Sequence, residues 1–208
     1  IVDMSNFYLD VIKDRLYVEK TDSATRRAAQ TVIYRVLEAL TLLISPILAF
    51  TSDEIWRSMK HTSKVNPDRA VYNDMPVVSE ISCDEGFMET WDKIHALRDN
   101  VQKALEEARN AKVIGASLEA KVTLFAKGDT FEFLSGVKDK LADVFIVSAV
   151  ELKNEGEGAF KGSFEGVSVT VEKAGGHKCE RCWKYTEDIG SDPNHPDICA
   201  RCAKVVSE

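Results

Sequence analysis

The sequence lacks the features that mark membrane, secreted and DNA-coating proteins. No apolar run reaches the roughly 18 to 20 residues of a membrane span, since Thr41, Ser45 and Pro46 interrupt the longest candidate, residues 40–50. No basic region followed by an apolar core and a small-residue cleavage site is present. Basic residues are not in excess: 27 Lys and Arg stand against 34 Asp and Glu, a net charge of -7. We therefore expect a cytoplasmic protein with no membrane or DNA partner.

The chain also lacks an initiator methionine, because it opens on Ile1. We expect it to be a fragment cut from a longer protein. Its 208 residues, 44% of them apolar, suffice for one large domain or for two to three small ones.

The first half of the chain shows helical periodicity. Ser5 is expected to cap a helix that ends near Tyr17, and residues 21–23 are expected to start a long helix that Pro46 interrupts. Thr51 or Ser52 is expected to cap a short third helix. Three stripes at helical spacing are expected to face a core: Tyr8, Val11, Ile12 and Leu16; Ile33, Val36, Leu37, Leu40, Leu43 and Ile44; and Trp91, Ile94, Leu97, Val101, Leu105 and Ala108. Residues 61–82, which include Pro67 and Pro76, predict an extended surface excursion before the helix over 87–112.

Beyond Gly115 the period changes from helical to alternating. Residues 121–126, 145–150 and 167–171 are predicted to be strands, with a helix over 137–142 between the first two. The sequence thus predicts a mainly α protein: a helical bundle over 1–112, a small α/β unit over 113–174 and, after a Gly175-Gly176 hinge, a zinc knuckle over 175–208.

The last thirty residues contain four of the five cysteines. Cys179 and Cys182 form one C-x-x-C pair, and Cys199 and Cys202 form a second pair after sixteen intervening residues. Such cysteines could form disulfides in a secreted protein, but without a secretory segment the spacing favours one tetrahedral zinc ion. Four thiolates close the coordination shell, so the predicted zinc is structural and His177 and His195 are spare candidates.

Two other chemistries share this cysteine pattern. A rubredoxin-like iron site uses the same ligands, and only metal analysis or colour excludes it. Two redox dithiols are disfavoured, because a redox C-x-x-C normally occurs once and near a βαβ pattern that this tail lacks.

Basic and aromatic residues surround the first cysteine pair. The cations only neutralise the thiolates in one interpretation; in the other, Arg181, Trp183 and Lys184 form a surface that stacks RNA bases and binds phosphates. Trp183 could equally pack under the knuckle as its core. Composition alone leaves these alternatives open.

Several segments resemble the C-terminal region of bacterial-type isoleucyl-tRNA synthetases. Residues 5–17 (SNFYLDVIKDRLY) and 43–56 (LISPILAFTSDEIW) are similar to the helical anticodon-binding domain that the isoleucyl, valyl and leucyl enzymes share. Residues 112–120 (KVIGASLEA) and 177–183 (HKCERCW) resemble the isoleucyl enzymes in particular. The HIGH and KMSKS nucleotide-binding motifs of that family are missing.

The resemblance implies that the intact enzyme uses ATP to ligate isoleucine to tRNA(Ile), and that this fragment is inactive alone. It also implies that the fragment grips the anticodon stem-loop, with Arg181, Trp183 and Lys184 at the loop and Lys13 and Arg15 on stem phosphates. Lys13 and Arg15 could instead form a solvated face paired with acidic neighbours. The expected partners are tRNA(Ile) and the rest of the parent synthetase, and the expected state is a monomer. The alternative is a zinc-stabilised module that docks within the parent enzyme without reading RNA.

Overall fold

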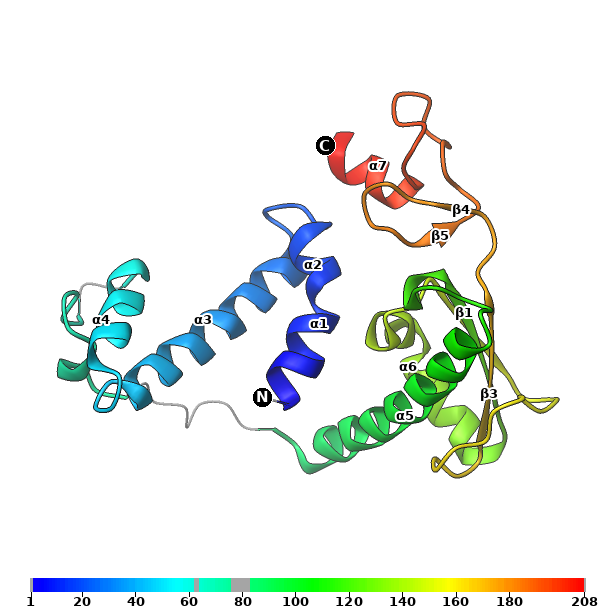
Figure 1. Cartoon of the computed structure of the whole chain (residues 1–208), viewed down its shortest axis with the longest axis horizontal. Helices are drawn as coiled ribbons and strands as arrows, with labels where there is room; N and C mark the ends of the chain where they lie inside the picture. Colours follow the sequence, from blue (N-terminus) through cyan, green and yellow to red (C-terminus); the bar gives the residue numbers. More distant parts are fainter. Residues whose placement is uncertain (1, 62–63, 76–82, 208) are drawn as a thin grey trace. The chain divides into compact units, whose positions relative to one another are not determined.

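The computed structural model describes residues 2–61, 64–75 and 83–207 (Figure 1). The chain forms two compact units. One unit joins Ile1–Lys20 to Glu85–Glu208, and the other is Thr21–Asp84.

The N-terminal segment is helical but less regular than the sequence suggests. It consists of the π-helical stretch η1 (Val2–Tyr8) and the short helices α1 (Leu9–Val11) and α2 (Lys13–Tyr17). Backbone hydrogen bonds through the buried Ile12 connect the pieces, since its N–H donates to Tyr8 (3.1 Å) and its carbonyl accepts from Leu16 (3.0 Å). The predicted cap at Ser5 is wrong, because Ser5 lies inside the π-helical stretch.

Unit Thr21–Asp84 is built on the long helix α3 (Ala24–Ile44), which confirms the predicted helix. The predicted apolar face is not buried, because Leu37, Leu40 and Leu43 are 39%, 51% and 59% exposed. The core of this unit instead joins Leu42 to Trp56 of α4 (Ala49–Ser58) and to Ala70. Helix α4 and the 3-10 turn η2 (Ala70–Tyr72) therefore pack on a different side of α3 from the predicted stripe.

Helix α4 begins earlier than expected. Leu48 is its N-cap and makes no side-chain cap hydrogen bond, so the predicted caps Thr51 and Ser52 lie inside the helix. The Asp53 carboxylate accepts hydrogen bonds from the Ala70 N–H (2.9 Å) and from Arg69 (2.8 Å). These bonds anchor residues 64–75 to α4, so the described part of the predicted surface excursion has one buried turn. Pro76 lies outside the described residues.

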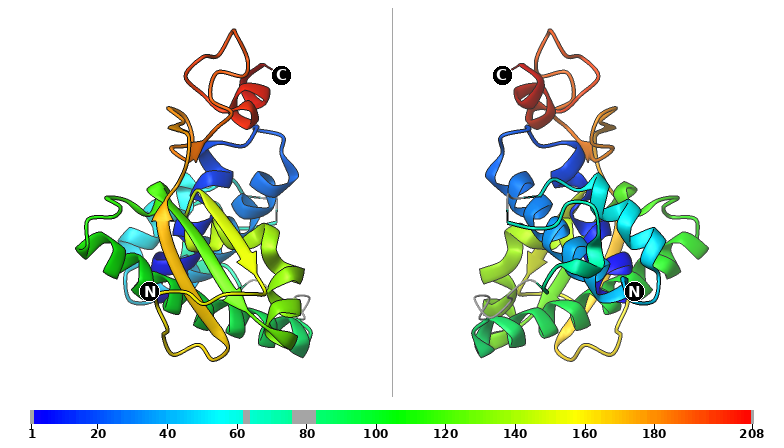
Figure 2. Two further views of the ribbon diagram at one scale, coloured as in Figure 1. Left: turned by 90° about the vertical axis from the view of Figure 1, so that its right-hand side faces the viewer. Right: turned by 90° about the vertical axis from the view of Figure 1, so that its left-hand side faces the viewer.

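The other unit contains a three-stranded sheet covered on one face by two helices (Figure 2). Helix α5 (Glu85–Asn110) and the turn η3 (Ser117–Glu119) lead into β1 (Ala120–Ala126), α6 (Gly128–Phe145), β2 (Ala149–Lys153) and β3 (Val167–Lys173). The strand order is β2-β1-β3, with β1 parallel to β2 and antiparallel to β3. Alternate residues of β1, such as Val122 and Leu124, are fully buried against Leu97 and Val101 of α5. The predicted helix over 87–112 and strands over 121–126 and 167–171 are confirmed.

The second strand and its preceding helix depart from the prediction. Helix α6 runs from Gly128 to Phe145, well beyond the predicted 137–142. It ends on Ile146 in a left-handed conformation (φ 58°), and β2 then spans Ala149–Lys153. The predicted strand over 145–150 begins too early: only residues 149–150 of it lie in β2, because Val144 and Phe145 are buried in the core as the last turn of α6.

Helix α5 contributes to the core that the sheet forms, so the compact units do not coincide with the three predicted segments. The boundaries at 112/113 and 174/175 stay a prediction. Among the described residues, no helix has both the length and the apolar character needed to cross a bilayer.

Candidate metal centre and nucleic-acid interface

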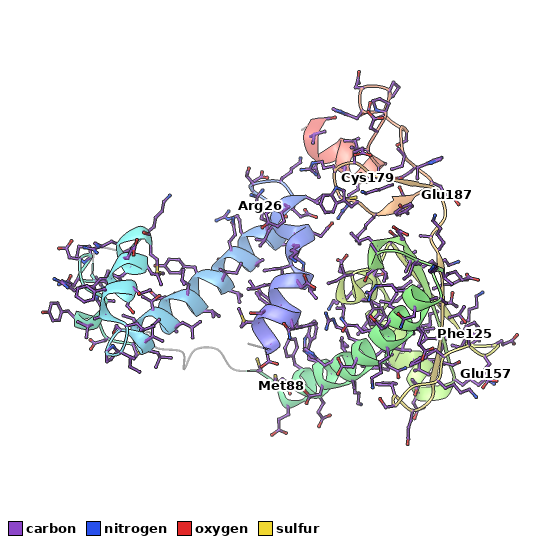
Figure 3. The ribbon with its side chains drawn as sticks, in the orientation of Figure 1. Arg26, Met88, Phe125, Glu157, Cys179 and Glu187 are labelled. Carbon is purple, nitrogen blue, oxygen red and sulfur yellow. The ribbon has the colours of Figure 1, made fainter. Side chains whose placement is uncertain are left out.

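The cysteine tail is a small knuckle that follows β3. Strands β4 (His177–Lys178) and β5 (Tyr185–Thr186) form a hairpin around the first C-x-x-C pair. The Cys179 N–H donates to the Lys184 carbonyl (2.9 Å), and the Trp183 N–H donates back to the Cys179 carbonyl (2.8 Å). The second pair stands at the start of α7 (Ala200–Ser207), so a turn and the start of a helix bring all four sulfurs together. Figure 3 labels Cys179 in this tail.

The predicted hinge at Gly175-Gly176 is closely packed. Gly176 has φ +79°, and a Cβ atom there would lie 2.1 Å from the Thr186 carbonyl oxygen. Only glycine fits this approach, which fixes the entry to the knuckle.

The four thiols have the spacing of a tetrahedral metal site. Their sulfur atoms all lie within 4.8 Å of one another, and the Sγ atoms of Cys182 and Cys199 are 3.8 Å apart. Tetrahedral zinc with Zn–S bonds of about 2.3 Å places its sulfurs about 3.8 Å apart, so the donor set fits the ion. Neither His177 nor His195 joins the cluster within the part of the chain that the structure describes.

The thiols differ in how readily they lose a proton. Burial alone would raise the pKa of Cys179, but the backbone N–H groups of Cys182, Cys199 and Arg181 outweigh it and lower that pKa to about 6. Burial raises the pKa of Cys182 and, with neighbouring thiols, that of Cys202. A divalent cation supplies the positive charge that keeps such a cluster ionised together.

The interior of the knuckle is completed by a residue from the other end of the chain. Val18, 5% exposed, packs with Cys179, Cys199 and Cys202, and Ile189 and Ile198 lie beside them. Trp183 is not this core, because its side chain is 59% exposed. Lys178 places its Nζ 5.4 Å from the Trp183 ring centroid.

Three basic side chains of the tail contact the rest of the unit. Arg181 donates to the Val18 carbonyl (2.7 Å), and Lys184 pairs with Asp143 of α6 (2.8 Å). Arg201 makes two hydrogen bonds to Asp14 of α2 (2.6 and 2.7 Å). Sequence reasoning missed the role of Arg201 and Asp14, since no spacing rule connects residues so far apart in the chain.

A cleft of about 590 Å³ lies between the knuckle, the N-terminal helices and the end of α6. Tyr17 and Trp183 line it and are 76% and 59% exposed. The other residues lining it are Asp10, Val11, Lys13, Asp14, Val18, Leu118, Ala142, Asp143, Ile146, Arg181, Cys182 and Lys184. Its three carboxylates balance its three cations, so the charged side chains of the lining carry no net charge.

Backbone strain is concentrated at the same cleft. Three non-glycine residues have positive φ in the described chain, and two of them, Ile146 (φ 58°) and Trp183 (φ 64°), line the cleft. A left-handed conformation costs an L-residue about 1–2 kcal/mol, and strained residues cluster at functional sites.

The other predicted RNA contacts lie on α2. Lys13 pairs with Asp10 (2.6 Å) and its side chain is 63% exposed, while Arg15 is half-buried. The His95 ring packs against Phe7, with ring centroids 4.1 Å apart and ring planes tilted by 52°. Cys83 is an exposed free thiol.

The chain belongs to the anticodon-binding domain family of tRNA ligases, since residues 1–124 match the family described as "Anticodon-binding domain of tRNA ligase". Residues 176–205 match the "Zinc finger found in FPG and IleRS". The matched finger contains all four cysteines, and with their geometry it supports one structural zinc ion.

The chain is also similar to curated isoleucine--tRNA ligases. The chain is 48% identical over 207 residues to "Isoleucine--tRNA ligase" of Carboxydothermus hydrogenoformans and 46% identical over 214 residues to that of Desulforamulus reducens. Both alignments cover 100% of this chain, but they cover 22% and 23% of those relatives. The chain therefore spans about a fifth of the length of the curated relatives it matches.

Proposed function

We propose that this region binds the anticodon stem-loop of isoleucine tRNA, within an enzyme that ligates isoleucine to that tRNA with ATP. The observation that carries the proposal is the cleft beside the cysteine knuckle, which the exposed Tyr17 and Trp183 both line. Unpaired bases in RNA loops are bound by stacking on aromatic side chains, whereas A-form stems are contacted mainly through their backbone. The names of the relatives support isoleucine tRNA as the partner.

We propose Cys179, Cys182, Cys199 and Cys202 as the ligands of the structural zinc. The ion neutralises the thiolates and holds the hairpin to α7. Its task is to keep Trp183 at the cleft, because a tail this small has almost no apolar core of its own.

The five proposed RNA residues have different tasks. Trp183 stacks on a base, and the exposed Lys13 reaches a phosphate together with Arg15. Arg181 and Lys184 already hold the tail through Val18 and Asp143, so their task is to position the cleft wall that carries Trp183.

The test is binding of the zinc-loaded chain to isoleucine tRNA, with the same tRNA carrying a changed anticodon as the control. We expect weaker binding to the control, and no preference between the two RNAs would overturn the specific-reader proposal. Trp183→Ala should weaken binding by roughly 1–3 kcal/mol if a base stacks on the ring.

The second candidate function is architectural. Three tail cations contact the unit itself, which favours a knuckle that orders the parent enzyme without touching RNA. Cys182→Ser in the full-length enzyme separates the two functions. Loss of tRNA charging with adenylate formation intact supports RNA binding, whereas loss of both steps supports the architectural role.

We also propose that the protein acts as a monomer in the cytoplasm. A reducing compartment suits a site that needs four free thiols. Sedimentation of the zinc-loaded chain, alone and with tRNA, tests the monomer.

A further inference from the structure

The contact between Asp14 and Arg201 joins the two ends of the chain. Both carboxylate oxygens accept hydrogen bonds from the Arg201 guanidinium, at 2.6 and 2.7 Å. The Asp14 side chain is 20% exposed and that of Arg201 is 40% exposed. Paired N–H···O bonds of this kind fix orientation as well as distance, because the guanidinium and the carboxylate must be coplanar.

A second arginine contacts the same segment. Arg181 binds the Val18 carbonyl, and the Val18 side chain is buried among the cysteines. Arg181 directly precedes Cys182 and Arg201 directly precedes Cys202. The backbone of each arginine is therefore fixed when its neighbouring cysteine binds the metal.

Tyr17 stands between these two contact points. Its side chain is 76% exposed and lines the cleft, and no hydrogen bond of the described chain accounts for that orientation. Tyr17 and Trp183 share a cleft only while the tail is docked on residues 14–18. The width of the cleft thus depends on the contact that Asp14 makes.

We propose that Asp14 is a positioning residue: through Arg201 it holds the zinc knuckle on α2, so that Tyr17 and Trp183 together form the site for one unpaired RNA base. This inference rests on the proposed function. If Asp14 acted only through its charge, its removal would strengthen RNA binding, because a carboxylate repels the phosphates of nearby RNA. A positioning role predicts weaker binding instead.

The experiment uses the full zinc-loaded chain and a labelled anticodon stem-loop of isoleucine tRNA. Asp14→Asn keeps the shape of the side chain but loses the charged pair. Asp139→Asn, at an exposed position of α6, is the charge-matched control. Arg201→Gln and the Asp14→Asn/Arg201→Gln double variant test whether the two residues act as a pair.

We expect Asp14→Asn to weaken RNA binding about 3- to 10-fold. This is the loss expected when the tail is docked on α2 in only a minor fraction of the molecules. Amide exchange should accelerate in residues 13–18 and 200–207, with zinc content unchanged. The double variant should bind no more weakly than Arg201→Gln, and Asp139→Asn should bind as well as the parent chain or better.

Two results overturn the inference: Asp14→Asn that binds RNA like Asp139→Asn, or faster exchange with unchanged RNA affinity. Loss of zinc from Asp14→Asn would also overturn it, since the residue would then support the metal site itself. Failure of the unaltered chain to bind the stem-loop would instead refute the proposed function.

Discussion

Replacing Trp183 with glycine should leave the tail about as stable as before while weakening RNA binding. Trp183 has φ 64°, in the left-handed region that glycine adopts freely. That conformation costs an L-residue about 1–2 kcal/mol, which glycine recovers. Glycine also has greater conformational freedom in the unfolded chain, which destabilises the folded state by about 0.4–1 kcal/mol.

The Trp183 ring itself adds little to the stability of the folded tail. The side chain is 59% exposed, and its cation–π interaction with Lys178 is worth about 0.5–1 kcal/mol at an exposed site. The glycine variant should therefore unfold within about 1 kcal/mol of the parent chain. Trp183→Ala also removes the ring but keeps the backbone strain, so it should be less stable than the glycine variant by about 1 kcal/mol.

Binding should not follow this order of stability. If a base stacks on the ring, both variants lose roughly 1–3 kcal/mol, or about 5- to 150-fold in affinity. Fluorescence anisotropy with the anticodon stem-loop measures the affinity, and denaturation of the zinc-loaded chain measures stability. Equal affinity of all three proteins would refute the stacking argument, and a glycine variant less stable than the alanine variant would refute the strain argument.

Removing zinc with a chelator should disorder the tail and leave the three-stranded sheet with α5 and α6 folded, since their common core contains none of the cysteines; amide exchange by residue distinguishes this from global unfolding. Zinc affinity should fall as the pH falls, by about tenfold per pH unit for each proton that must be displaced. The fall should steepen below about pH 6, where Cys179 also becomes protonated, and a competitive chelator titration that shows no such steepening would contradict this. Leu124→Ala, at a fully buried position of β1, should lower the free energy of unfolding by about 2–5 kcal/mol; chemical denaturation measures it, and zinc content should not change.

Periodicity predicted the elements that bury one face against a neighbour. Helix α5 and strands β1 and β3 follow their patterns because the apolar residues that define the pattern also form the core, as Leu97 and Val122 do. The pattern failed where an apolar face has no partner within its unit, as at Leu40 and Leu43 of α3. It also failed at 145–150, because a run of apolar residues satisfies a helix end and a strand equally well until packing selects one.

The candidate site was likewise predicted from the sequence only in part. The clustering of the four cysteines was predicted, since each C-x-x-C turn brings its own two sulfurs together and the spacing is typical of pairs that share one metal ion; their role as zinc ligands stays a prediction. The cleft was not predicted, because no spacing in the sequence connects Tyr17 and Ile146 with the cysteine tail, and the left-handed backbone of Ile146 and Trp183 has no sequence signature.

By itself, the sequence predicted the four-cysteine cluster, the main helices and the family, because these depend on short spacings and on local periodicity. Only the tertiary structure decided that Arg181, Arg201 and Lys184 hold the tail, and that Trp183 faces a cleft with Tyr17. The physical reason is distance along the chain. A hydrogen bond between Asp14 and Arg201 depends on how every intervening element packs, and no local rule encodes that arrangement.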